Sequence, residues 1–137
     1  MKQLLITLSL LLVLFLSSCS NQPAGEITVV STEEMETLLK LDDVQLIDVR
    51  TEKEHKNGHL ALSQNIDFNS PTFDEDIKKL DKLKPVILYC QGGGRSAKCA
   101  KKLKDAGFVK IYDLEGGFSK WQHHNLDLKL KKKTKSS

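Results

Sequence analysis

The 137-residue sequence is poor in aromatic side chains and in cysteine, with one Trp, two Tyr, five Phe and three Cys. So few aromatic side chains provide no stacking platform for nucleic-acid bases. No set of Cys and His residues has the spacing of a zinc site, and the adjacent His123 and His124 diverge on a helix. Neither a Ser-His-Asp arrangement nor a Walker-type phosphate loop is present. We therefore expect neither a metal site nor an organic cofactor.

The positive net charge of +3 comes from the C-terminal tail, residues 126–137, which carries five lysines. Residues 19–125 hold 15 basic and 17 acidic side chains, so the body of the chain is mildly acidic. This balance argues against a nucleic-acid partner, which requires a basic face on the folded domain. The tail is expected to be solvated and disordered; the alternative is contact with anionic lipid headgroups.

The N-terminus has the pattern of an export signal. A short basic start precedes the apolar run Leu4–Leu16, which is too short to span a membrane comfortably. Leu16-Ser17-Ser18-Cys19 then resembles the lipobox of bacterial lipoproteins. The resemblance implies a signal peptide over 1–18, acylation of Cys19, and a tether over 19–26. The alternatives are an ordinary signal peptide cleaved nearby, or an uncleaved anchor.

The lipoprotein interpretation predicts an exported protein that is lipid-anchored to a bacterial membrane and faces the periplasm or the cell exterior. Ser20 favours the outer membrane where a cell has two membranes.

Strand-like and helix-like segments alternate along the rest of the chain. Apolar or β-branched runs predict strands over 27–30, 44–49, 65–68, 86–89 and 109–112. Capping signals and helical periodicity predict helices from residue 32, over 51–56, 73–80 and 97–106, and a helical turn over 118–122. This alternation indicates one α/β domain over residues 27–125, with a mainly parallel central sheet flanked by helices. Ligands of such sheets bind at the carboxyl ends of the strands.

The segment Cys90-Gln91-Gly92-Gly93-Gly94-Arg95-Ser96 lies between a predicted strand and a predicted helix. Three successive glycines allow the backbone to curl tightly, so that its N–H groups point at one spot beside the positive end of the helix. A thiol placed there should ionise readily, and Arg95 adds a permanent charge with a forked set of donors. We expect Cys90 to be a nucleophile and Gln91 through Ser96 to form an anion-binding cradle.

The spacing between Cys90 and Arg95 helps to distinguish classes of cysteine-dependent enzyme, because four residues separate the two. Cysteine-dependent phosphatases place five residues there, and their longer loop wraps a tetrahedral phosphate. The shorter loop resembles the active-site loop of the rhodanese (thiosulfate sulfurtransferase) family.

Three further segments resemble the same family in the same order: Leu46-Ile47-Asp48-Val49-Arg50, Glu54 through Ile66, and Leu114-Glu115-Gly116-Gly117-Phe118 with Trp121. The resemblance spans roughly residues 27–122 and implies the three-layer rhodanese-like fold. The sequence departs from the family at Ala61-Leu62-Ser63, where the family has Pro-Gly-Ala, and at His55, where it usually has an aromatic residue.

The resemblance implies a sulfurtransferase. The Cys90 thiolate would take the outer sulfur of a small anionic donor such as thiosulfate, and the loop amides and Arg95 would stabilise the departing sulfite. A thiophilic acceptor such as cyanide or a thiol would then remove the sulfur. A non-catalytic module that binds an anion or a protein is an alternative, as is a phosphatase or arsenate reductase, which the spacing disfavours. We expect a monomer; the physiological donor and acceptor stay open.

Four other residues have two interpretations each. Cys99 is a small core residue or a resolving thiol for Cys90, and the core interpretation is preferred. The resemblance implies that Asp48 supports the loop environment and that Arg50 pairs with an acid such as Glu54. An ordinary structural ion pair is the preferred alternative. His59 is expected to make a structural hydrogen bond rather than to act in catalysis.

Overall fold

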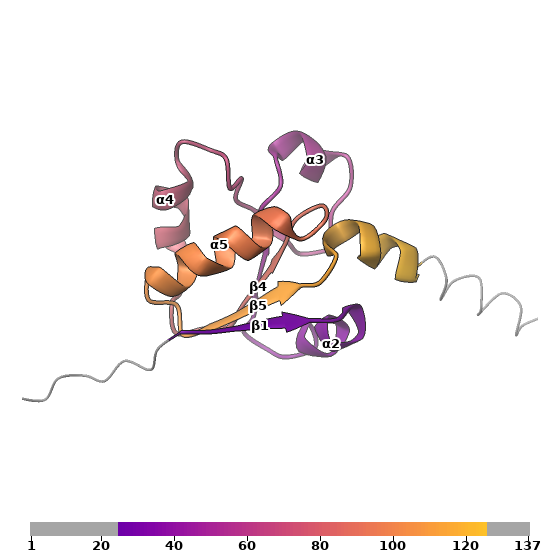
Figure 1. The fold of residues 1–137 in the computed structure, drawn as a ribbon, viewed down its shortest axis with the longest axis horizontal. Coiled ribbons are helices and arrows are strands. Elements are labelled where there is room, and N and C mark those ends of the chain that lie inside the picture. The colour runs from indigo at the N-terminus through magenta and orange to yellow at the C-terminus, as the bar shows by residue number, and fades with distance from the viewer. Residues whose placement is uncertain (1–24, 126–137) are drawn as a thin grey trace, which may run out of the picture.

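The computed structural model describes residues 25–125 and contains a five-stranded parallel sheet (Figure 1). The strand order is β1-β5-β4-β2-β3, and every paired neighbour runs parallel. The strands are β1 (Glu26–Val30), β2 (Gln45–Asp48), β3 (Gln64–Asn65), β4 (Val86–Tyr89) and β5 (Lys110–Leu114). The predicted α/β fold with a parallel sheet is confirmed.

Helices cover both faces of the sheet and produce three layers (Figure 1). They are α2 (Thr32–Leu38), α3 (Glu52–Lys56), α4 (Phe73–Asp76) with the 3-10 helix η1 (Ile77–Lys79), α5 (Gly94–Asp105), and a helix over residues 117–125. Helices α4 and α5 pack on one face, while α2 and the helix over 117–125 pack on the other. Helix α3 buries none of its residues and lies near the carboxyl ends of the strands.

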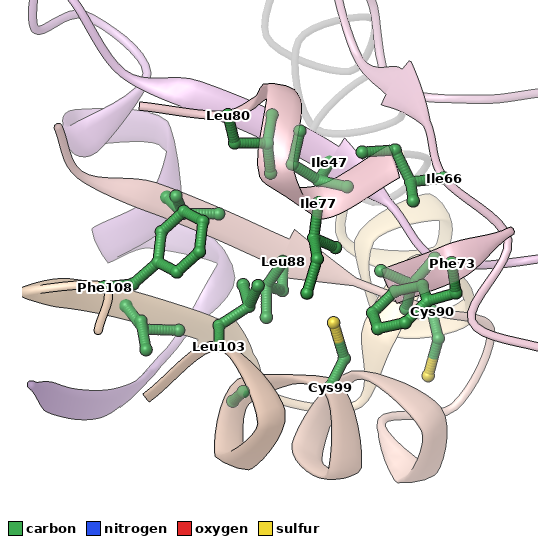
Figure 2. Close-up of a cluster of buried hydrophobic side chains, with 14 residues drawn as sticks. Ile47, Ile66, Phe73, Ile77, Leu80, Leu88, Cys90, Cys99, Leu103 and Phe108 are labelled. Atoms are coloured by element: carbon green, nitrogen blue, oxygen red, sulfur yellow. The ribbon is translucent and has the colours of Figure 1, made fainter. Parts of the chain in front are cut away.

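Each face of the sheet has its own apolar cluster. Figure 2 shows the larger cluster, in which Leu88 of β4 and Leu103 of α5 lie among Phe73, Ile77 and other buried residues. The second cluster includes Met35, Ile87, Tyr89, Leu114 and Phe118. Because β4 contributes to both clusters, all four of its residues are buried, as expected for a central strand of a parallel sheet.

Several predicted boundaries were wrong by a few residues. Strand β1 begins at Glu26, which pairs with Lys110, so the predicted tether to residue 26 is one residue too long. The strand predicted over 65–68 is only Gln64–Asn65, and the helix predicted over 73–80 tightens into a 3-10 turn at Ile77. Helix α5 begins at Gly94 rather than at residue 97, because the glycine loop itself already turns into the helix.

The predicted signal peptide 1–18, Cys19, the tether up to residue 24, and the Lys-rich tail 126–137 lie outside the described residues. Within residues 25–125, no helix is both long enough and apolar enough to cross a membrane.

Candidate active site

Cys90 follows the last residue of β4 and lies at the carboxyl edge of the sheet. Its side chain is only 1 % exposed. The strands on either side, β2 and β5, end at the same edge. Asp48 of β2 is therefore the neighbour of Tyr89, and Asp113 of β5 is the neighbour of Leu88. The site therefore occupies the position where parallel sheets bind ligands.

The glycine loop folds around the sulfur of Cys90. Gly93 adopts φ +102°, which favours glycine, and its amide donates to Cys90 Sγ at 3.1 Å. No side chain caps α5, so the N–H groups of its first turn remain available at the positive end of the helix. A Cβ atom on Gly92 or Gly94 would meet no atom within 4 Å, so space is open in front of the loop.

The surroundings of Cys90 favour its thiolate. Burial alone would raise the pKa of the thiol. Hydrogen bonds from the Ser96 hydroxyl and from the amides of Ser96, Gly93 and Gly92 outweigh burial, so the pKa lies below its ordinary value. This combination of a lowered pKa and nearby N–H donors is what a sulfur nucleophile requires.

The start of the C-terminal helix holds the loop from behind. The amide of Phe118 donates to the Cys90 carbonyl at 2.8 Å, and the amide of Ser119 donates to the Gln91 carbonyl at 3.1 Å. The Gln91 side chain returns a hydrogen bond from Nε2 to Ser119 Oγ at 2.8 Å. The loop is therefore fixed by residues almost thirty positions further along the chain.

Asp48 and Arg50 form a buried ion pair, with exposed fractions of 0 % and 2 %. Arg50 Nη2 donates to Asp48 Oδ2 at 2.7 Å, and Nε donates to both carboxylate oxygens. The predicted pairing of Arg50 with Glu54 is wrong. The two partners are two residues apart at a strand end and lie on the same side, so Asp48 is the nearer acid. The structural ion pair preferred from the sequence is confirmed.

Arg50 also connects this ion pair to the loop. Its Nη1 donates to Gln91 Oε1 at 3.0 Å, and its Nη2 donates to the Gly58 carbonyl at 2.7 Å. The guanidinium lies over the ring of Phe118, 4.2 Å from its centroid. Asp48 and Arg50 are therefore placed as supports for the loop.

Arg95 is paired with Glu54 of α3. Its Nη1 and Nη2 each donate to a different carboxylate oxygen of Glu54, both at 2.7 Å. These hydrogen bonds lower the pKa of Glu54 to about 2. The sequence suggested Glu54 only as a partner for Arg50. Its position in the Thr51-x-x-Glu54 capping box was the available signal for an ordered carboxylate.

His55 belongs to the site surroundings, which was not foreseen. Its Nδ1 lies 2.9 Å from Asp48 Oδ2, and its ring stacks on that of His59 with centroids 3.9 Å apart. Burial would raise the pKa of Asp48, but hydrogen bonds from Arg50 and His55 hold it below its usual value. His59 Nδ1 lies 2.9 Å from the His55 carbonyl, so the structural role expected for His59 is confirmed.

Cys99 is a buried free thiol inside the larger apolar cluster. In Figure 2 its sulfur points into this cluster, whereas the sulfur of Cys90 points away from it. Burial, together with the nearby Asp113, raises the pKa of Cys99 to about 12. The interpretation of Cys99 as a core residue is confirmed.

Two hollows in the surface differ in their position relative to the loop that carries Cys90. A cavity of about 220 Å³ beside the loop is lined by Arg50, Glu54, Asn57, Gly58, Gln91 and Phe118. A larger hollow of about 350 Å³ borders Lys82 and Phe108, which precede β4 and β5 and so lie at the opposite edge of the sheet. The smaller cavity borders Gln91, the residue that follows Cys90, and is the better candidate for a substrate. Residues 25–125 contain no group of three or more potential metal ligands.

Comparison with known proteins agrees with this geometry. The model of the rhodanese-like domain matches residues 31–124, and the chain belongs to the rhodanese-like domain family. A thiosulfate sulfurtransferase GlpE from Coxiella burnetii is 34 % identical over 88 residues, which are 64 % of this chain and 80 % of that protein. The uncharacterized protein YqhL of Bacillus subtilis is 42 % identical over 77 residues; the match covers 56 % of this chain and only 60 % of YqhL.

Solved structures give the same fold. A rhodanese-like domain protein from Staphylococcus aureus superimposes with a TM-score of 0.62 at 29 % identity, over 69 % of this chain and 90 % of that one. A rhodanese-related protein from Thermoplasma volcanium gives 0.63 at 28 % identity, over 70 % and 91 %. The predicted three-layer rhodanese-like fold is confirmed.

Proposed function

We propose that this protein is a sulfurtransferase that carries a sulfane sulfur on Cys90 between an anionic donor, such as thiosulfate, and a thiophilic acceptor. The observation that carries the proposal is the Cys90 sulfur in its cradle, with the Gly93 amide 3.1 Å away and a lowered thiol pKa. The names of the GlpE relatives support the same reaction class.

In the first step, the Cys90 thiolate attacks the outer sulfur of the donor. A bond forms between the two sulfur atoms, the donor's own bond to that sulfur breaks, and its electron pair leaves with sulfite when the donor is thiosulfate. The amides of Gly92, Gly93 and Ser96 stabilise the negative charge on the Cys90 persulfide.

In the second step, a nucleophile such as cyanide or a thiolate attacks the outer sulfur of the persulfide. The electron pair of the broken S–S bond returns to Cys90, which is again a thiolate. Neither step needs an oxidant, because the donor supplies sulfur at the required oxidation level. Arg95 contributes its positive charge near the sulfur; its charge and that of Cys90 attract each other.

A non-catalytic binding module is the alternative. The same cradle would hold an anion or a partner without transferring sulfur, and Cys90 would then be dispensable. The lowered pKa of Cys90 favours the enzyme, because a binding module has no need of a reactive thiolate. The four-residue spacing up to Arg95 disfavours a phosphatase or an arsenate reductase.

The test is the mass of the intact protein after exposure to thiosulfate, followed by exposure to cyanide. The expected result is the gain of one sulfur atom on Cys90 and its loss as thiocyanate. Cys90→Ser should gain no sulfur and should keep the fold, whereas the control Cys99→Ser should retain most of the activity. Sulfur loading in Cys90→Ser, or no loading of the wild type by any donor, would contradict the proposal.

We also propose that the protein is exported and anchored to a membrane through acylated Cys19. The proposal rests on the lipobox-like Leu16-Ser17-Ser18-Cys19 in the sequence. Several acyl chains should hold the protein firmly, so deletion of residues 129–137 should leave it in the membrane fraction. Cys19→Ala should block acylation. A wild-type protein that takes up no radioactive fatty acid and is recovered in the soluble fraction would show ordinary secretion instead.

A further inference from the structure

Arg95 is already paired through both of its terminal nitrogens. Both of its terminal nitrogens donate to Glu54, and the two side chains are only 26 % and 32 % exposed. Glu54 is itself fixed, because its Oε2 accepts from the amide and the hydroxyl of Thr51. Arg95 therefore faces the site as one half of a bidentate ion pair, with two of its five N–H groups committed to Glu54 and its charge balanced by that carboxylate, so an incoming oxyanion meets a paired arginine rather than a free cation.

The other charges around the loop are balanced in the same way. Arg50 is held by Asp48, and Lys120 of the C-terminal helix is paired with Glu115. Asp67 adds a second negative charge that acts on Arg95. Gln91 through Gly94 carry no charged side chain. An anion in front of Cys90 therefore meets backbone amides, but each of these cations already has an acidic partner.

We propose that Glu54 acts as a specificity-determining residue, and that the preferred donor is the persulfide of a small thiol rather than dianionic thiosulfate. This inference rests on the proposed sulfurtransferase function and narrows its substrate class. The persulfide of an otherwise uncharged thiol carries at most one negative charge, and the amides of the loop suffice for it. Thiosulfate carries two charges and approaches a thiolate in a site where Glu54 balances Arg95 and Asp67 adds a further negative charge, so like charges oppose it.

The chemistry with a persulfide is balanced without a further reactant. The Cys90 thiolate attacks the outer sulfur, and a new S–S bond forms while the donor S–S bond breaks. The electron pair leaves with the inner sulfur as the thiolate of the small donor thiol. Cys90 ends as the persulfide, as in the proposed function, and no sulfite needs to be stabilised.

The experiment compares the second-order rate constant of sulfur loading onto Cys90 with thiosulfate and with the persulfide of 2-mercaptoethanol, an otherwise uncharged thiol, as probes. For the wild type, persulfide should be favoured by about 100-fold, because like charges in a binding site cost several kcal/mol. Glu54→Gln frees the fork of Arg95 and keeps a side-chain oxygen for the helix cap. It should raise the thiosulfate rate about tenfold, the value of one charge-assisted hydrogen bond regained, and leave the persulfide rate within about twofold.

Two controls isolate the cause. Glu52→Gln removes an exposed carboxylate from the same helix, where it pairs with Lys56, and should change neither rate. Adding Arg95→Gln to Glu54→Gln should abolish the gain with thiosulfate. The inference is overturned when wild type prefers thiosulfate, when Glu54→Gln leaves the ratio of the two rates unchanged, or when the gain survives loss of Arg95. Should neither probe load sulfur onto Cys90, the proposed function itself fails.

Discussion

Gly117 packs directly against the backbone of Cys90, and there is no room for a side chain between them. A Cβ atom on Gly117 would lie 2.4 Å from the Cys90 carbonyl oxygen and 2.9 Å from the Gln91 carbonyl carbon. Gly117 also adopts φ +60°, a conformation that favours glycine. The second glycine of the Gly116-Gly117 pair thus allows the C-terminal helix to approach the loop that carries the nucleophile.

Gly117→Ala should therefore damage both stability and activity. We expect a loss of about 1–3 kcal/mol in the free energy of unfolding, because a strained backbone and a close contact must both be relieved. Sulfur loading should fall as well, since the Cys90 carbonyl has to move. Urea denaturation and loading rates measure the two effects. Gly94→Ala, where a Cβ atom meets nothing within 4 Å, is the stability control, and equal stability of the two variants would contradict the packing argument.

Ser96→Ala should make Cys90 less reactive at neutral pH. The Ser96 hydroxyl is one of the groups that lower the pKa of the thiol against the effect of burial. Without it, the pKa of Cys90 should rise toward that of an ordinary cysteine, and the pH midpoint of alkylation by iodoacetamide should shift upward. Ser70→Ala, which removes a hydroxyl that bonds to Thr72 in an exposed turn, should leave the midpoint unchanged. An unshifted midpoint in Ser96→Ala would show that the loop amides act alone.

Asp113→Asn should stabilise the protein at neutral pH. Burial raises the pKa of Asp113, and its Oδ1 has no hydrogen-bond partner among the described residues. A raised pKa means that the ionised form weakens the fold, so the penalty is present at neutral pH and absent below the unfolded pKa of about 3.9. The variant should melt at a higher temperature than wild type at pH 7, and the difference should shrink toward pH 3. Exposed Asp42→Asn should show no such difference, and a gain that is independent of pH would point to packing instead.

Leu62→Gly should also be stabilising. Leu62 adopts φ +66° and is 98 % exposed, so its side chain gains no burial and suffers the steric cost of a left-handed backbone. Removing the Cβ atom should recover about 1 kcal/mol. Leu83→Gly, at an exposed leucine without a positive φ, should be neutral or destabilising. The measurement is the melting temperature of the two variants and of the wild type. A loss of stability in Leu62→Gly would mean that the leucine makes a compensating contact.

The sequence was sufficient for the fold and for the position of the nucleophile, because both depend on local patterns. The buried run Val86–Tyr89 marked a central strand, and the following Cys90 and glycines marked its carboxyl end. The capping box at Ser31 marked one helix start, which the structure shows as expected. Such signals lie within a few residues of each other, so no long-range information is needed.

The ion pairs could not be assigned in this way. From the sequence, Glu54 is a possible partner of either Arg50 or Arg95. Which arginine it pairs with depends on how α3 packs against the loop. Glu54 contacts Arg95 across 41 positions of sequence, and His55 reaches back to Asp48 of β2. The sequence carries no signal for the burial of Asp113 for the same reason, since an acid in the last strand is buried only once the chain has folded.

The burial of Cys99 has a consequence for the lifetime of the protein under oxidative stress. Cys90, if oxidised to a sulfenic acid, needs a second thiolate to form a protective disulfide before it is oxidised irreversibly. Within residues 25–125 the one other cysteine is Cys99. Its pKa is raised to about 12, so it stays a thiol at neutral pH, and its sulfur points into the apolar cluster (Figure 2). Rescue then depends on a thiol from outside residues 25–125, so the working life of this protein under oxidising conditions depends on the supply of such a reductant.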